Sequence, residues 1–241
     1  AGVAVLGTAG WALELAPGGV ALAAGVGAAA SLAIASMAPS LQAFGPAVCR
    51  GPRRPEVALT FDDGPDPAST ERLCRALESV GAHGTFFLLA DRAERHPELV
   101  RRLVDGGHEV ALHGPAHDAR LTLQAPAIGA ERLRRAAAEL ARLSGQPVRW
   151  FRPPFGATSP RLAEAVRRAG LTTVWCSVRP YDGGWTRPAK VRARVRRAGP
   201  GDIVLLHEGG GRAVEALPAV LSDLGARSLR AVTLGALLAA P

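Results

Sequence analysis

Two adjacent carboxylates, Asp62 and Asp63, and two histidines four residues apart, His113 and His117, have the residue types and spacing of a metal site. Imidazoles at this spacing can converge on one ion if the intervening turn is helical, and this turn contains a proline that can start one. One carboxylate and two imidazoles leave a fourth position for water, as in a catalytic zinc site. We therefore expect one divalent metal ion, with zinc as the first candidate. Taken alone, each pair also fits a simpler interpretation: an acidic loop before a helix, or two unrelated surface histidines.

Three further polar residues follow predicted strands. Arg152 ends the fourth strand, Asp182 lies in the loop after the fifth, and His207 ends the sixth. The paired acids follow the first strand and the paired histidines follow the third, so all of these residues lie at carboxyl ends of strands. That is the face on which barrels of parallel strands carry their active sites. The sequence therefore predicts that these side chains meet in one site.

Short apolar runs alternate with amphipathic stretches from residue 56 onward. The predicted strands are residues 57–61, 84–89, 109–112, 149–152, 172–176, 202–206 and 231–234. The predicted helices include residues 69–80, 97–105, 126–143, 160–169 and 188–198; four open with proline and four are followed by glycine. Strands that alternate with helices over short links indicate an α/β fold with a parallel sheet or barrel. Seven such units are too few for a full eight-fold barrel.

The first 38 residues differ in composition from the rest of the chain. They carry one acid, Glu14, and no lysine or arginine, and they divide into apolar stretches at residues 1–15 and 20–38. The second stretch is long enough to span a bilayer, which requires about 20 apolar residues. We expect residues 1–38 to form an apolar helical hairpin that anchors the protein, with one or two spans, in a bacterial inner or plasma membrane. A cleaved signal peptide is the competing interpretation.

Residues 39–55 are rich in proline and contain three arginines, Arg50, Arg53 and Arg54. We expect a basic linker here, followed by a catalytic domain at residues 56–241. Arginines just after a span favour a cytoplasmic position for that domain under the positive-inside rule. The three cysteines, Cys49, Cys74 and Cys176, form no CxxC pair, and we expect them to be free thiols. Free thiols agree with a reducing compartment.

The net charge of +8 would suit an anionic partner such as nucleic acid. All but one of the 29 basic residues are arginine, and several lie in adjacent pairs on helix backs. Aromatic residues do not interleave with them, which weakens the case for base stacking. We therefore interpret most of these arginines as solvated surface charge and expect no nucleic-acid partner.

Four motifs resemble, in order, those of the polysaccharide deacetylase family, the NodB-homology domain of carbohydrate esterases. They are TFDDGP at residues 60–65, HxxxH at 113–117, RPPFG at 152–156 and LLH at 205–207. The resemblance extends from about Val57 to Leu234, and the first motif alone is highly specific. It implies a distorted seven-fold (β/α) barrel that hydrolyses N-acyl, or sometimes O-acyl, groups of carbohydrates.

The resemblance implies a role for each matching residue. Asp63, His113 and His117 would bind the metal ion. Asp62 would be the general base that takes a proton from water, and Arg152 would pair with it to hold it ionised and oriented. The chemistry agrees with this division, because a metal ion activates water and a separate carboxylate must accept the proton.

The acid side of the site follows the family less closely. The resemblance makes His207 the general acid, and the backbone N–H of Phe155 a donor to the oxyanion. In the family an aspartate immediately before a tryptophan orients the catalytic histidine, whereas here two glycines separate Asp182 from Trp185. Asp182 is still the best candidate for that role, while Trp185 need not wall the sugar site. Glu208 follows the histidine, where aspartate is usual.

Three functions compete at this point. The first is removal of N-acyl groups, above all N-acetyl, from an amino-sugar glycan. The second is deacylation or deformylation of a lipid-linked amino sugar at the membrane surface, which the expected anchor and basic linker suggest. The third is a carbohydrate-binding pseudoenzyme, which the complete set of ligands, base and acid argues against. A glycosidase is disfavoured because the paired histidines have no role in a two-carboxylate mechanism. The resemblance favours an active site outside the cell, whereas the arginines after the expected span favour a cytoplasmic one. The sequence therefore does not decide on which side of the membrane the active site lies.

Overall fold

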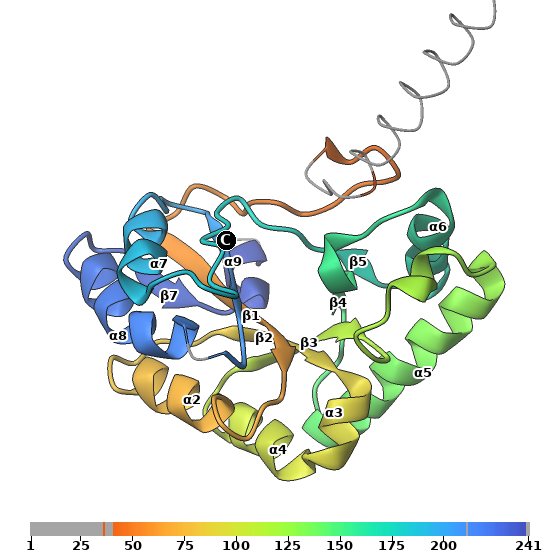
Figure 1. Ribbon diagram of the computed structural model, residues 1–241, viewed down its shortest axis with the longest axis horizontal. Helices are drawn as coiled ribbons and strands as arrows, with labels where there is room; N and C mark the ends of the chain where they lie inside the picture. Colours follow the sequence, from red (N-terminus) through yellow and green to blue (C-terminus); the bar gives the residue numbers. More distant parts are fainter. Residues whose placement is uncertain (1–35, 37–40, 211, 240–241) are drawn as a thin grey trace, which may run out of the picture. The chain divides into compact units, whose positions relative to one another are not determined.

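Seven parallel strands form the centre of the computed structural model, which describes residue 36 and residues 41–210 and 212–239 (Figure 1). The strands are β1 (Glu56–Gly64), β2 (Thr85–Leu89), β3 (Glu109–Gly114), β4 (Trp150–Phe151), β5 (Thr172–Thr173), β6 (Ile203–His207) and β7 (Arg230–Val232). All seven strands predicted from the sequence are confirmed. β4 and β5 are shorter than predicted, because only two residues of each pair with a neighbouring strand.

The sheet order is β5-β4-β3-β2-β1-β6, and β7 pairs with the first residues of β1. β1 therefore has a neighbouring strand along each edge, because its residues 60–64 pair with β2 and its residues 58–62 pair with β6. The outermost strands, β5 and β6, are not paired with each other in the described part of the chain. A single bridge between Val178 and Val204 brings the segment after β5 against β6. The structure thus confirms an α/β fold with parallel strands, in the form of a partial barrel.

Helices cover the outer face of the strands. They are α2 (Thr70–Glu78), α3 (Ala90–Arg95), α4 (Pro97–Asp105), α5 (Pro126–Ser144), α6 (Pro160–Arg168), α7 (Pro188–Val195), α8 (Arg212–Gly225) and α9 (Leu234–Leu238). Neighbouring helices contact each other in the order α7, α8, α2, α4, α5 and α6, which forms an arc around the sheet (Figure 1). The five predicted helices are confirmed, and α3, α8 and α9 are additions to them.

The side chains of β1 alternate between two apolar clusters, as the two-residue period of a strand requires. Leu59 and Phe61 belong to the cluster between the sheet and the helices, whereas Ala58 belongs to a cluster on the inner face. Thr60 and Asp62 share the inner face with Ala58, because they lie two and four residues further along the strand. Cysteines in both clusters are free thiols, as the sequence predicts. The strand thus directs Asp62 into the barrel interior.

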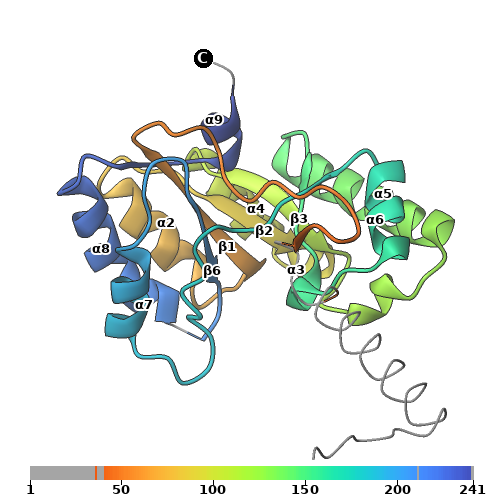
Figure 2. The same ribbon diagram turned by 90° about the horizontal axis from the view of Figure 1, so that it is seen from above.

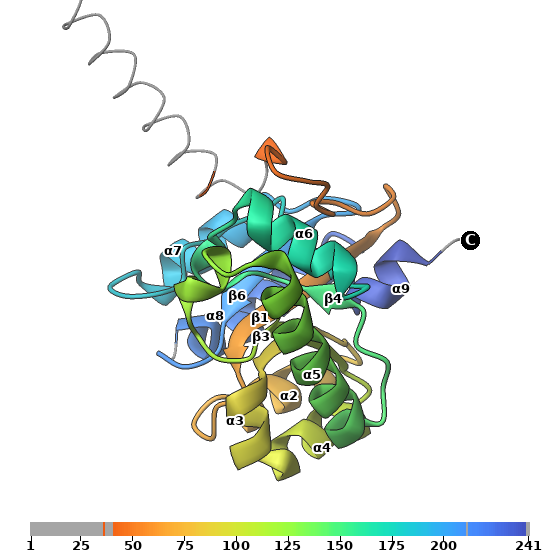
Figure 3. The ribbon, with the colours of Figure 1, turned by 90° about the vertical axis from the view of Figure 1, so that its right-hand side faces the viewer.

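Helix α9 closes the amino ends of the strands. The backbone N–H of Leu234 donates to Thr85 Oγ1 at 2.7 Å, and that of Gly235 donates to Glu109 Oε2 at 3.0 Å. Thr85 and Glu109 are the first residues of β2 and β3. Leu237 packs into the inner cluster from the same side. The carboxyl ends of the strands therefore remain for the site, with α9 at the opposite end (Figures 2 and 3).

The segment before β1 runs along the barrel, beside β5 and the start of β6. Val48 exchanges backbone hydrogen bonds with Thr173 and Trp175, at 2.9 and 2.8 Å, and Arg50 forms an ion pair with Asp202 at 2.6 Å. The expected helical hairpin at residues 1–38 lies outside the described residues, apart from residue 36. None of the described helices combines the length and apolar composition that crossing a bilayer requires.

Candidate active site

An irregularity in β1 brings both acids of the TFDDGP motif into the site. Asp62 pairs in register with Phe87 and Gly64 with Leu88, so Asp63 is an extra residue on β1. Its φ of +72° is a left-handed conformation that aspartate adopts more readily than most residues. In a regular strand, adjacent side chains point to opposite faces, whereas a bulge re-aims one of them. The two carboxylates can therefore serve one site from consecutive positions.

Asp63, His113 and His117 meet at this bulge and form what we call the metal triad. The Nε2 atoms of both histidines lie 3.3 Å from Asp63 Oδ1, and the three candidate ligand atoms all lie within 4.8 Å of one another. Tetrahedral zinc with bonds of about 2.0–2.1 Å places its ligand atoms ~3.3 Å apart. Asp63 Oδ1 is buried and has no hydrogen-bond partner among the described residues. The triad therefore fits a divalent metal ion.

Protonation of the triad also suits metal binding. Burial alone would raise the pKa of Asp63, but the neighbouring imidazoles of His113, His207 and His117 outweigh it and hold the pKa below its usual range. Burial lowers the pKa of His117, and this effect outweighs the negative charge of Asp63, which would raise it. The neutral form of this imidazole is therefore favoured over the protonated form. A metal ligand set needs an ionised carboxylate and neutral imidazoles. Both shifts are in the required direction.

Arg152 pairs with Asp62, as the sequence predicts. The Arg152 side chain is fully buried, and its Nη1 donates to Asp62 Oδ1 at 2.7 Å and to Thr60 Oγ1 at 2.8 Å. Its Nη2 donates to the carbonyl of Trp175 at 3.1 Å, and the guanidinium lies 4.0 Å from the centre of the Phe87 ring. These contacts fix the guanidinium, so it holds the Asp62 carboxylate in one orientation.

His207 and Asp182 also meet. The backbone N–H of His207 donates to Asp182 Oδ2 at 2.8 Å, and His207 Nδ1 lies 2.8 Å from Asp182 Oδ1. Asp182 is 2% exposed, whereas the His207 side chain is 31% exposed. Burial would lower the pKa of His207, but the hydrogen bond to Asp182 and the negative charges of Asp182, Asp62 and Asp63 raise it above the usual value. The two inserted glycines therefore do not separate Asp182 from the histidine.

Phe155 lies beside the metal triad, whereas the Trp185 side chain is exposed to solvent. Phe155 stands in a short 3₁₀ turn, Pro154–Gly156, with φ of +59°, and its ring centre lies 3.9 Å from that of His117. The backbone N–H of Phe155 is the donor that the resemblance assigns to the oxyanion, and the positive φ of this residue departs from helical values. Trp185 is 98% exposed, so it does not pack against the residues that surround the triad.

Two further residues support the site: Arg92, which sequence patterns missed, and Glu208, which the sequence marked only as the residue after the histidine. Arg92, from α3, donates through Nη1 to the backbone carbonyl of Asp63 at 2.6 Å and so fixes the bulge. Glu208 is buried directly after His207 and accepts a hydrogen bond from Thr70 Oγ1, while burial raises its pKa to about 8. A Cβ atom on Gly64 would lie 1.7 Å from Glu208 Oε1, so the motif needs glycine there. The sequence signal for Arg92 was its place shortly after the carboxyl end of β2.

The chain matches known proteins in sequence and in fold. A family model described as polysaccharide deacetylase matches residues 50–174. A peptidoglycan-N-acetylglucosamine deacetylase of Bacillus cereus is 34% identical over 196 residues, which are 76% of this chain and 87% of that protein. A chitooligosaccharide deacetylase of Sinorhizobium fredii is 37% identical over 167 residues, which are 66% of this chain and 74% of that protein.

A solved structure of known activity class has the same fold as this chain. The family 4 carbohydrate esterase from Streptomyces lividans is 31% identical, with a TM-score of 0.69, over 76% of this chain and 93% of its own. The family model covers more than half of the chain, and the two relatives are matched over most of their length. The chain therefore belongs to the polysaccharide deacetylase family and is a hydrolase of carbon–nitrogen amide bonds.

Proposed function

We propose that this protein removes N-acetyl groups from an amino-sugar glycan, with a divalent metal ion, zinc as the first candidate, at the metal triad. One observation carries the proposal: two separate proton-transfer groups accompany the triad, Asp62 held by Arg152 and His207 held by Asp182. Asp62 and His207 are partners in register on the neighbouring strands β1 and β6. The names of the relatives, which act on peptidoglycan and chitooligosaccharides, support this substrate class.

The first half of the reaction needs a base. A divalent ion supplies two effects when it is bound: polarisation of the amide carbonyl and a water of lowered pKa. Asp62 then accepts a proton from the attacking water. Arg152 holds this carboxylate in one orientation through the hydrogen bond from its Nη1 to Asp62 Oδ1. The N–H of Phe155 donates to the oxygen of the former carbonyl as negative charge develops there.

The second half needs an acid, because an amine leaves only when its nitrogen is protonated. His207 donates that proton, and the amide carbon–nitrogen bond breaks to give acetate and the free amino sugar. Asp182 binds the Nδ1 side of the imidazole, so Nε2 carries the proton that is transferred. Asp182 and Arg152 thus have different tasks: Asp182 keeps a histidine protonated, and Arg152 orients a carboxylate.

A lipid-linked amino sugar remains the second substrate hypothesis, together with the predicted membrane anchor at residues 1–38. A reporter fused to the carboxyl terminus would locate the catalytic domain on one side of the membrane. A cytoplasmic reporter would favour a lipid-linked precursor, and an external reporter would favour an assembled glycan. Release of acetate or formate from each substrate then distinguishes the acyl groups.

The direct test is acetate release by the full-length protein from N-acetylated chitooligosaccharides and from peptidoglycan glycan strands. We expect one acetate for each new free amine, loss of activity after chelation and recovery with zinc. Metal-loaded protein that binds these glycans without releasing acetate from either would contradict the proposal and support the pseudoenzyme hypothesis.

A further inference from the structure

The segment that carries Asp182 is the most basic part of the chain. Between Val178 and Gly199 it contains seven arginine or lysine residues and a single acid, Asp182. Asp182 is buried and bonded to His207, so it does not neutralise the surface of this segment. Most of the net charge of +8 therefore gathers in one segment next to the proposed general acid.

Three of these cations lie in a row along one side of α7. Arg187 precedes the helix, and Lys190 and Arg194 follow at spacings of three and four residues, which place them on one face over about 10 Å. Val191 and Val195 occupy the buried side of the same helix. We call Arg187, Lys190 and Arg194 the basic row.

The basic row has no acidic partner among the described residues. Several other arginines of the helices do have such partners: Arg167 meets Glu164, and Arg192, also on α7, meets Asp223. Arg194 instead donates to the backbone carbonyl of Pro180 at 2.5 Å. The row therefore presents positive charge that the protein itself does not neutralise.

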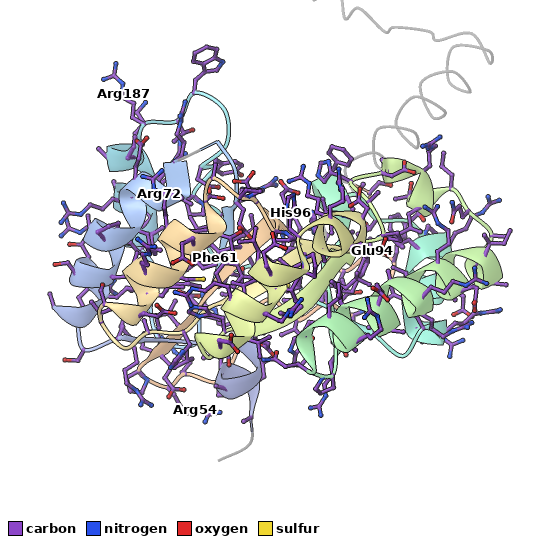
Figure 4. The ribbon with its side chains drawn as sticks, turned by 90° about the horizontal axis from the view of Figure 1, so that it is seen from below. Arg54, Phe61, Arg72, Glu94, His96 and Arg187 are labelled. Atoms are coloured by element: carbon purple, nitrogen blue, oxygen red, sulfur yellow. The ribbon has the colours of Figure 1, made fainter. Side chains whose placement is uncertain are left out.

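Two exposed aromatic rings accompany the row. Trp185 is 98% exposed and Tyr181 is 59% exposed. The Arg194 guanidinium lies 5.6 Å from the centre of the Tyr181 ring. Trp185, Thr186 and the basic row together line a surface hollow of about 530 Å³. Figure 4 shows Arg187 projecting from the body of the molecule at this loop.

We propose that the basic row and Trp185 form a subsite for a sugar that carries an anionic group, a carboxylate or a phosphate, next to the sugar that is deacetylated. An exposed indole offers a flat apolar surface for a sugar ring, and its N–H offers a donor. Guanidinium and ammonium groups beside it bind carboxylate and phosphate oxygens. Trp185 lies three residues from Asp182, so one glycan chain can occupy the hollow and reach His207. This inference rests on the proposed function and specifies its substrate as an anionic glycan.

The test compares substrates of equal length, each with N-acetylated amino sugars. One is a neutral chitooligosaccharide, the second a peptidoglycan glycan fragment whose alternate sugars carry carboxylates, and the third a phosphorylated chitooligosaccharide. We expect the wild-type kcat/KM to be higher on at least one anionic substrate than on the neutral one. That preference should decrease as salt is added, because the charges are exposed and screened. The second and third substrates distinguish carboxylate from phosphate.

The double variant Arg187→Ala/Lys190→Ala removes two charges of the row. It should lower kcat/KM on the preferred anionic substrate by about two- to thirtyfold, the contribution expected of two exposed ion pairs. The kcat/KM on the neutral substrate should not change. The matched control, Arg101→Ala/Arg149→Ala, removes two exposed charges, one on α4 and one before β4 at the amino ends of the strands. The control should keep the wild-type ratio, which excludes an effect of net charge alone.

Equal loss on anionic and neutral substrates, or no loss on either, would overturn the subsite. So would a row variant that retains its substrate ratio but loses binding to phosphatidylglycerol vesicles, because the surface would then bind lipid. Activity on the neutral substrate reports the proposed deacetylation itself, so its absence in the wild-type protein would count against the function and not against the subsite alone.

Discussion

Replacement of Asp182 by asparagine tests how the acid of the site is maintained. The Asp182 carboxylate accepts two hydrogen bonds from His207, one from the backbone N–H and one from Nδ1, each 2.8 Å long. Asparagine has one oxygen, so it can accept only one of them, and it carries no charge. A hydrogen bond to a charged group contributes about 1.5–3 kcal/mol, which corresponds to roughly 10–100-fold in rate if it stabilises protonated His207.

The loss should depend on pH. Asp182 raises the pKa of His207, so the wild-type protein keeps this imidazole protonated above the usual histidine range. In Asp182→Asn the alkaline limb of the pH profile of kcat/KM should move to lower pH. The difference from wild type should therefore be small at acidic pH and approach the full 10–100-fold at alkaline pH. Metal content should not change, because Asp182 is not part of the metal triad.

A matched control isolates this effect from a simple loss of stability. Asp202 is another buried carboxylate, at the opposite end of β6, where it accepts from Ser177 Oγ and pairs with Arg50. Asp202→Asn should lower thermal stability without moving the alkaline limb. An Asp182→Asn variant with an unshifted limb and wild-type rate would refute the role of Asp182, and equal shifts in both variants would refute its specificity.

Two further predictions concern metal binding and stability. His113→Ala and His117→Ala should each lower zinc occupancy, measured by elemental analysis, whereas His207→Ala should leave it unchanged; equal loss in all three would reassign His207 to the metal site. Glu208 has a pKa of about 8 in the fold, above its value of about 4.5 in an unfolded chain, so its contribution to the free energy of unfolding should be complete below pH 4.5 and be lost as the pH rises to 8. Glu208→Gln should flatten this decrease in a series of thermal melts, and an unchanged slope would contradict the burial argument.

The strands could be predicted because their apolar residues are local and periodic. Those of β1 lie in residues 57–61, a run that only Thr60 interrupts and that ends at two acids, and this run forms the centre of the strand Glu56–Gly64. Helices that open with proline were also predicted, whereas α8, with Pro218 inside it, was not. An internal proline removes a hydrogen bond of the helix, so the sequence alone argues against a helix that tertiary packing nevertheless stabilises.

The pairings in the site needed contacts that are distant in sequence. The motifs predicted which residues meet, and the Arg152–Asp62 and Asp182–His207 contacts are confirmed. The bulge at Asp63 could not be predicted, because it depends on the register between β1 and β2. Exposure of Trp185 likewise depends on how its loop leaves the sheet, which no local pattern determines.

The central claim is that Asp62 and Asp63, adjacent in sequence, have different functions, base and metal ligand. Acetate release and metal content should therefore be measured together in Asp62→Asn and Asp63→Asn. We expect Asp62→Asn to keep its fold and its metal but to lose activity by about 10²–10⁴-fold, the usual contribution of a general base. Asp63→Asn should lose metal as well as activity. Metal loss in Asp62→Asn together with full metal occupancy in Asp63→Asn would contradict the assignment.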